Sequence, residues 1–197
     1  MSSQKEVYIV LTSTGTYLSQ IIKYYTNHDL CHVSISFDRQ LHEVYSFGRK
    51  DQRNPFVGRF VKEDLTGPVF KHANCAIYKV ATSNEAYRKM KQQINHFQCH
   101  SQYYRYNFLG MIAVMFNIEW NRKNHYFCSH FVNEILVSGD VHLFTKPAPL
   151  ITPEDFIHAN LPLLYQGKLQ NYIRSSNRLY AREKEAYQKT YKLAQKL

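Results

Sequence analysis

Apolar and polar residues alternate most clearly in residues 31–38, "CHVSISFD". The apolar positions are Val33, Ile35 and Phe37, and the polar positions between them are His32, Ser34 and Ser36. A period of two residues is typical of a strand that buries one face. The pattern therefore predicts a strand with an apolar side and a polar side.

A second strand is expected to return directly beside the first. Residues 38–39 suit a two-residue turn, and the segment 41–47 then continues the alternation. In this register Glu43 and Tyr45 share the polar face with His32. These three side chains would then meet on one side of a hairpin.

Other segments carry weaker patterns of the same two kinds. Strands are expected at 7–16 and 69–80, a basic loop at 49–67, and helices at 17–28, 83–98, 106–118 and 152–157. Ser83 or Thr82 would cap the second of these helices, and Thr152 with Pro153 would begin the last. The very apolar segment 106–118 is predicted to be a buried helix.

The C-terminal residues 171–197 predict one long basic helix outside a domain formed by residues 1–170. Seven lysines and arginines stand there against two glutamates, a net charge of +5. A Tyr/Leu stripe runs along one side: Tyr172, Leu179, Tyr180, Tyr187 and Tyr191. We expect this stripe to dock on the domain or on a partner. The alternative is that the helix lies on anionic lipid or stacks on nucleic acid.

Composition places the chain among folded proteins with a substantial core. Its 197 residues are 44% hydrophobic, and the formal net charge of +10 favours anionic surroundings without choosing among them. The four cysteines lack the spacing of a disulfide scaffold. No secretory leader or membrane-spanning stretch is visible, so we expect a cytoplasmic protein with free thiols.

Cys128 stands at the beginning of an amphipathic helix. In "HYFCSHFVNEIL" (125–136) the apolar residues recur at helical spacing after Cys128. The first N–H groups of a helix and its dipole favour a thiolate there. Taken alone, such a cysteine is more commonly a small buried hydrophobe.

Three stretches together resemble a known family: "CHVSISFD", "LHEVYSFGRK" and "HYFCSHFV". They are similar to the circularly permuted papain-fold cysteine hydrolases related to NlpC, with the YiiX-like branch nearest and lecithin:retinol acyltransferase-like proteins more distant. The resemblance covers residues 7–170. It implies an α+β fold in which an antiparallel sheet packs against the helix that bears the cysteine.

The resemblance also implies site residues. Cys128 would be the nucleophile, His32 its base and Glu43 the group that orients His32, with Tyr45 and His42 as alternatives to Glu43. The Cys128 N–H would donate to the oxyanion.

The substrate would contact three further residues. Tyr126 would be a second oxyanion donor or a substrate contact, and Tyr45 would also bind the substrate. Arg49, with Arg53, would meet an anionic group of the substrate at the cleft border.

The implied chemistry is acyl transfer. The thiolate would attack an amide or ester carbonyl of a peptide, cell-wall fragment or lipid, without a metal or organic cofactor. One alternative is a non-catalytic protein of the same fold that binds an anionic ligand, a membrane surface or nucleic acid, although no specific nucleic acid is predicted. Another is structural zinc held by the H-x-x-C groups in 28–32, 96–100 and 125–130.

Overall fold

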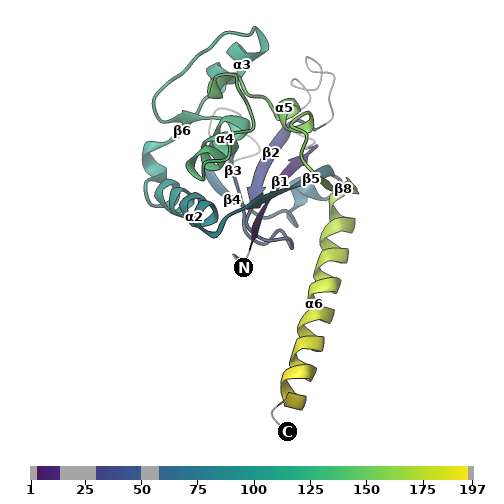
Figure 1. Cartoon of the computed structure of the whole chain (residues 1–197). Coiled ribbons are helices and arrows are strands. Elements are labelled where there is room, and N and C mark those ends of the chain that lie inside the picture. Colours follow the sequence, from purple (N-terminus) through teal and green to yellow (C-terminus); the bar gives the residue numbers. More distant parts are fainter. Residues whose placement is uncertain (1–3, 14–29, 50–57, 195–197) are drawn as a thin grey trace.

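A six-stranded antiparallel sheet forms the centre of the fold (Figure 1). The computed structural model describes residues 4–13, 30–49 and 58–194. The strands are β1 (Lys5–Thr12), β2 (His32–Ser36), β3 (Val44–Arg49), β4 (Gly58–Glu63), β5 (Asn74–Thr82) and β8 (Leu163–Lys168). Their order across the sheet is β4-β3-β2-β1-β5-β8.

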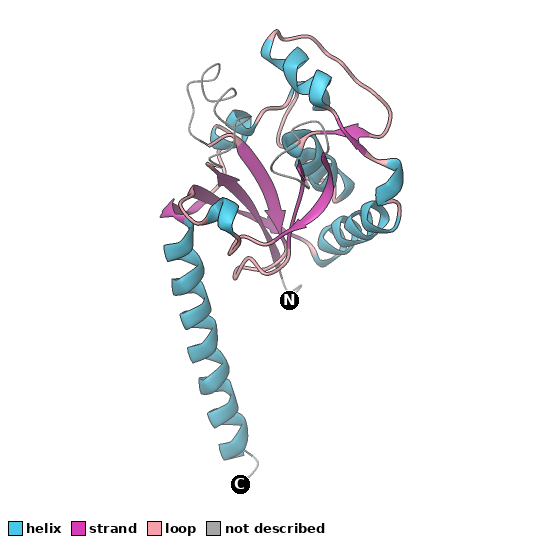
Figure 2. Cartoon of the chain, turned by 180° about the vertical axis from the view of Figure 1, so that it is seen from behind, coloured by secondary structure: helices cyan, strands magenta, loops and turns pink. Residues whose placement is uncertain are grey.

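Helices cover both faces of this sheet. The helices are α2 (Asn84–Cys99), α3 (Phe108–Met115), α4 (Cys128–Ser138), α5 (Pro153–Ile157) and α6 (Leu169–Ala194), with 3-10 turns at Pro68–Phe70, Ser101–Tyr103 and Ala148–Leu150. A short parallel pair, β6 (Arg105–Tyr106) and β7 (His125–Tyr126), lies beside them. Helices α2 and α4 pack on one face, and the first turns of α6 pack on the other (Figure 2). The expected α+β class, with an antiparallel sheet packed against the Cys128 helix, is confirmed.

The core has two layers because strand residues alternate between the two faces. Toward α2 and α4 lie the odd residues of β1, β2 and β3: Val7, Ile9, Leu11, Val33, Ile35, Tyr45 and Phe47. On the opposite face Tyr8, Val10, Val44 and Ile77 contact Leu169, Tyr172 and Ile173 of α6. Because both faces of the sheet are covered at β1, the successive residues in the centre of this strand are all buried.

The predicted N-terminal ends of α2 and α5 are confirmed. The Ser83 hydroxyl accepts from the Ala86 N–H, as predicted for the cap of α2. At α5, Thr152 and Asp155 form a reciprocal capping box with Pro153 in the first turn. These boundaries depend on residues within one helical turn.

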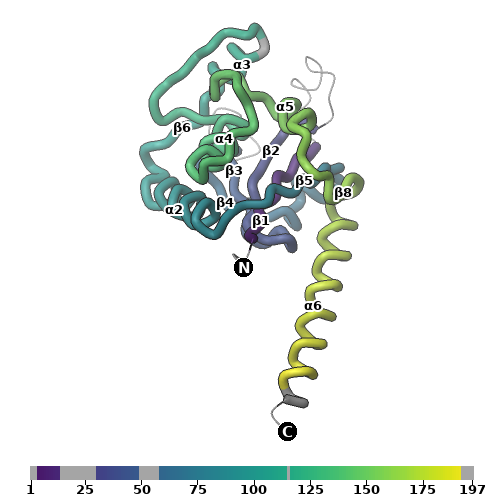
Figure 3. Tube along the Cα trace, in the orientation of Figure 1, coloured from purple at the N-terminus to yellow at the C-terminus, as the bar shows by residue number. Residues whose placement is uncertain are grey.

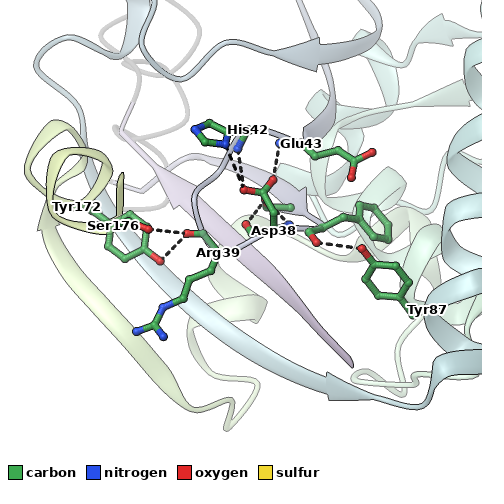
Figure 4. Close-up of polar contacts among 9 residues, drawn as sticks. Asp38, Arg39, His42, Glu43, Tyr87, Tyr172 and Ser176 are labelled. Atoms are coloured by element: carbon green, nitrogen blue, oxygen red, sulfur yellow. Dashed lines mark hydrogen bonds and ion pairs between the residues drawn. The ribbon is translucent and has the colours of Figure 1, made fainter. Parts of the chain in front are cut away.

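The predicted hairpin register is wrong. A two-residue turn at residues 38–39 would pair Ser36 with Leu41. In the structure Ser36 pairs with Val44, a shift of three residues, and Tyr45 stands opposite Ile35. Residues 37–43 form a loop in place of the two-residue turn (Figure 4). An odd shift exchanges the two faces of a strand, so Tyr45 faces α2 and α4.

Asp38 holds this loop in shape. Its carboxylate accepts the backbone N–H of His42 at 3.0 Å and that of Glu43 at 2.6 Å. Leu41 adopts φ 62° and buries its side chain. The loop also contacts α6, because Tyr172 and Ser176 donate their hydroxyls to the Arg39 carbonyl (Figure 4).

Three further predictions need correction. Residues 58–63 of the expected basic loop are strand β4, and residues 163–168 form the unpredicted edge strand β8. The apolar helix predicted over 106–118 spans only 108–115, and it is not wholly buried, because Leu109 and Ile112 are exposed. The helix expected at 17–28 lies outside the described residues.

The long C-terminal helix is confirmed, and only its first turns dock on the domain, whereas docking of the remaining turns on a partner stays a prediction. Tyr172 and Ile173 are buried, whereas Leu179 is half exposed and Tyr187 is 73% exposed. Beyond its first turns α6 extends away from the sheet (Figure 1). No helix within the described ranges has both the length and the apolar character needed to cross a bilayer.

Candidate active site

His32 and Cys128 meet although 96 residues separate them in the chain. His32 is the first residue of β2, and Cys128 is the first residue of α4. Their side chains lie close enough for Cys128 to influence the charge of the His32 imidazole. Cys128 is only 8% exposed, and the His32 side chain is 15% exposed. The sequence prediction that these two residues come together thus agrees with the geometry.

Glu63 of β4 is the carboxylate that contacts His32. His32 Nε2 donates to Glu63 Oε1 at 2.7 Å, and the Glu63 side chain is nearly buried. The other carboxylate oxygen, Oε2, accepts the Ser34 hydroxyl at 2.5 Å. Both oxygens of Glu63 are therefore engaged, which fixes the carboxylate relative to the imidazole.

Opposing influences act on the charge of His32. Burial lowers the pKa of His32, but the negative charge of Glu63 and the hydrogen bonding of the imidazole to Cys128 and Glu63 outweigh it. The resulting pKa lies well above 6.5. The imidazolium form is favoured at neutral pH.

Gly48 leaves space for this arrangement on the neighbouring strand β3. A Cβ placed on Gly48 would lie 3.9 Å from His32 Cε1 and 3.7 Å from Glu63 Oε1. A methyl group would be in ordinary contact, whereas a longer side chain would compete for the space where the ring and the carboxylate meet. The absence of a side chain at Gly48 therefore leaves room for the contact between His32 of β2 and Glu63 of β4.

The first turn of α4 directs backbone N–H groups toward its N-terminal end. Phe127 is the N-cap and offers no side-chain acceptor, and the first intrahelical bond runs from the Phe131 N–H to the Phe127 carbonyl. The N–H groups of Cys128, Ser129 and His130 precede that bond. Such groups, next to a nucleophile, are suited to bind a developing oxyanion.

The structure does not bring Glu43 to His32. Glu43 lies in the loop before β3, where it accepts the Tyr45 hydroxyl at 3.0 Å and forms an ion pair with Lys91 of α2. The physical reason is the register shift, which removes Glu43 and Tyr45 from the face that carries Ser34 and Ser36. His42, the other alternative, is exposed near Asp38.

The predicted substrate-binding residues have separate surroundings. Tyr45 stacks on Phe60 within the core, and burial, with hydrogen bonding to Glu43, raises its pKa to about 12. Tyr126 packs against the rings of Phe47 and His130, and burial raises its pKa to about 12.

The predicted arginine contacts are only partly described. Arg49 ends β3 opposite Gly58, but its side chain lies outside the described residues, as does Arg53.

The other cysteines differ from Cys128 in their environment. Cys31 and Cys75 are buried, and burial raises the pKa of Cys75 to about 12, while Cys99 is exposed. Within the described ranges, no three metal-ligating side chains gather into a group that could hold an ion. His28, part of one H-x-x-C group, lies outside those ranges.

Sequence reasoning missed Glu63 and the role of Ser34. In "GRFVKE" (58–63) Gly58 and Phe60 are buried, while Arg59 and Lys62 are exposed. This alternation was a usable strand signal that the basic composition of the segment concealed. Even with β4 recognised, its pairing with β3 is a non-local contact that the local pattern does not specify.

Comparison with protein-family models, with curated proteins and with solved structures finds no match to this chain. The assignment of chemistry therefore rests on the geometry of Cys128, His32 and Glu63.

Proposed function

We propose that this chain is a cysteine-dependent hydrolase of amide or ester bonds, with a permuted papain-like fold. The observation that supports it best is the contact of one histidine with both a helix N-terminal cysteine and a buried carboxylate. A nucleophile, a base and an orienting group in that order are the parts that acyl transfer requires.

Each group would have one role in the reaction. Glu63 holds Nε2 of His32, so Nδ1 is the ring nitrogen available to the Cys128 thiol. The proton of the Cys128 thiol resides on His32, which gives a thiolate–imidazolium pair, and the thiolate sulfur attacks the substrate carbonyl carbon. The carbonyl oxygen becomes an oxyanion that accepts N–H groups of the first turn of α4.

Two further steps complete the turnover. The tetrahedral intermediate collapses to a thioester as its C–N or C–O bond breaks, and His32 gives its proton to the departing amine or alcohol. His32 then takes a proton from water, which attacks the thioester. The acid product leaves as the C–S bond breaks, and the thiolate of Cys128 and the imidazolium of His32 are restored.

Ser34 would be a positioning residue for this reaction. Its hydroxyl bonds Glu63 Oε2 at 2.5 Å and lies 3.3 Å from His32 Nε2. A carboxylate restrained at both oxygens keeps the imidazole in one orientation.

Alkylation by iodoacetamide across pH, followed for each cysteine by peptide mass mapping, tests the proposal. Native Cys128 should react faster near neutral pH than exposed Cys99, and His32→Ala should slow Cys128 roughly tenfold. Glu63→Gln should slow it as well, because the charge that favours the imidazolium is lost. Glu43→Gln is the matched control and should leave the rate unchanged.

Turnover is checked with activated esters and amides, using Cys128→Ala as the blank. Acyl-enzyme at Cys128, detected by intact mass, would support the thioester route. The proposal fails if Cys128 reacts only after unfolding, as buried Cys75 should. It also fails if His32→Ala and Glu63→Gln behave like Glu43→Gln.

A further inference from the structure

The segment of α3 and the turn after it expose an unusual run of apolar side chains. We use the name apolar prong for five residues that are each 37–65% exposed: Leu109, Ile112, Phe116, Ile118 and Trp120. Scattered apolar residues are ordinary on a protein surface, but five within twelve positions form a local concentration that commonly marks a contact site.

The backbone of the prong is held in a defined shape. Asn107 caps α3 by accepting the Gly110 N–H, and its amide donates to the Trp120 carbonyl at 3.3 Å. At the other end Asn117 adopts φ 55°, and the Ile118 N–H bonds the Ala113 carbonyl. These bonds form a Schellman-type end, so Phe116 and Ile118 are presented by an ordered turn.

The prong is an excursion whose two ends are joined immediately before the candidate nucleophile. Arg105 and Tyr106 of β6 pair in parallel with His125 and Tyr126 of β7, and α4 begins two residues later with Cys128. Figure 3 follows the chain from α3 through this pair into α4. The base of the prong is therefore anchored next to the beginning of α4.

Charge around the prong is positive. Arg105, Arg122 and Lys123 are exposed, whereas Glu119 is the single acid between residues 105 and 123. The chain as a whole carries +10. Apolar side chains suit the acyl-chain region of a bilayer, and cations suit its anionic headgroups. A tryptophan between the two suits the boundary of these regions.

We propose that the apolar prong inserts into the interface of an anionic phospholipid bilayer. Its exposed side chains are hydrocarbon and indole, and the cations Arg122 and Lys123 lie two and three residues after Trp120, where lipid phosphates would lie. The free end of α6 lies at the opposite end of the molecule in both views (Figures 1 and 2). This contact is therefore separate from the basic helix and does not depend on the proposed catalysis.

Trp120 is the only tryptophan of the chain, which makes the test direct. The full chain is titrated with vesicles of two parts phosphatidylcholine to one part phosphatidylglycerol, and sedimentation is measured beside tryptophan emission. We expect co-sedimentation, a shift of Trp120 emission to shorter wavelength and quenching by brominated lipid. Pure phosphatidylcholine vesicles and high salt should weaken binding.

A pair of substitutions locates the contact. Phe116→Ser with Ile118→Ser keeps the probe and should lower partitioning about tenfold or more. Leu179→Ser with Tyr187→Ser removes two comparably exposed apolar side chains from α6 and should leave partitioning unchanged. Cys128→Ala should bind as the wild type does.

Several results would overturn the proposal. Binding without any change in Trp120 emission would mean adsorption by charge alone. Loss of binding only in the α6 pair would place the contact on the basic helix. An emission shift that follows protein concentration without vesicles would mean that the prong contacts a second copy, and failure to bind anionic vesicles would exclude insertion.

Discussion

His130 shows at the scale of one residue how burial sets a titration. It lies in the first turn of α4, is 7% exposed, and its Nδ1 has no hydrogen-bond partner among the described residues. Burial lowers the pKa of His130 from 6.5 to about 4. The neighbouring ring of Tyr126 does not compensate a charge on the imidazole.

This shift predicts a pH dependence of stability. Between pH 6.5 and about 4 the unfolded chain binds a proton at His130 that the folded chain refuses, so the free energy of unfolding falls as pH falls. The loss is about 3 kcal/mol across that window. Urea denaturation at pH 7 and at pH 4.5 measures it.

The comparison of variants isolates His130 from other groups. Burial raises the pKa of Glu134, four residues further along α4, and this shift makes stability change in the opposite direction as the pH falls. His130→Phe should remove most of the His130 contribution, whereas the exposed His72→Gln should keep it. Equal pH dependence in His130→Phe and wild type would contradict the assignment.

At the scale of elements, the loop before β3 decides which side chains face the site. Asp38 supplies acceptors for two backbone N–H groups, and the hydroxyl of Tyr87 in α2 donates to the Phe37 carbonyl at 3.0 Å (Figure 4). A two-residue turn would leave none of these contacts. The longer loop is selected because it buries Leu41 and satisfies these backbone groups.

Asp38→Ala should destabilise the fold by about 1–2 kcal/mol, because the N–H groups of His42 and Glu43 lose their acceptor. Chemical denaturation checks this value. Asp140→Asn is the matched control: Asp140 is exposed in an ion pair with Lys89, and asparagine tolerates its φ of 59°. The interpretation fails if both variants lose equal stability.

At the scale of the whole molecule, α6 divides into a docked part and a projecting part. Leu169, Tyr172 and Ile173 complete the core layer behind the sheet, and Ser176 is buried beside them. From Leu179 to Tyr191 the apolar side chains are exposed. Only the first turns therefore contribute to the stability of the domain.

Two truncations separate these parts. A chain that ends at Arg178 should unfold at nearly the wild-type temperature. A chain that ends at Lys168 should lose about 5 kcal/mol or more, since three large buried side chains are removed. Thermal unfolding by circular dichroism distinguishes them, and similar losses in both would show that the projecting part is docked after all.

The sequence predicts a feature well when the residues that form it lie close together along the chain. Helix α2 with Ser83 and helix α5 with Thr152 were predicted because a cap and its partners lie within a few residues. Cys128 and His32 were predicted because each stands in a recognisable stretch at the beginning of its element. The alternation of residues 32–37 also identified β2.

Only the tertiary structure decided the register of β2 with β3 and the carboxylate beside His32. Strand pairing depends on contacts between distant residues, and Asp38, Leu41 and the packing of α6 all act on the loop that sets the register. Glu63 reaches His32 across β3, where Gly48 leaves space, so its position depends on three strands at once. The sequence by itself determined local elements such as α2 and α5 and singled out Cys128 and His32 as candidates, whereas packing across the sheet placed Glu63, and not Glu43, beside His32.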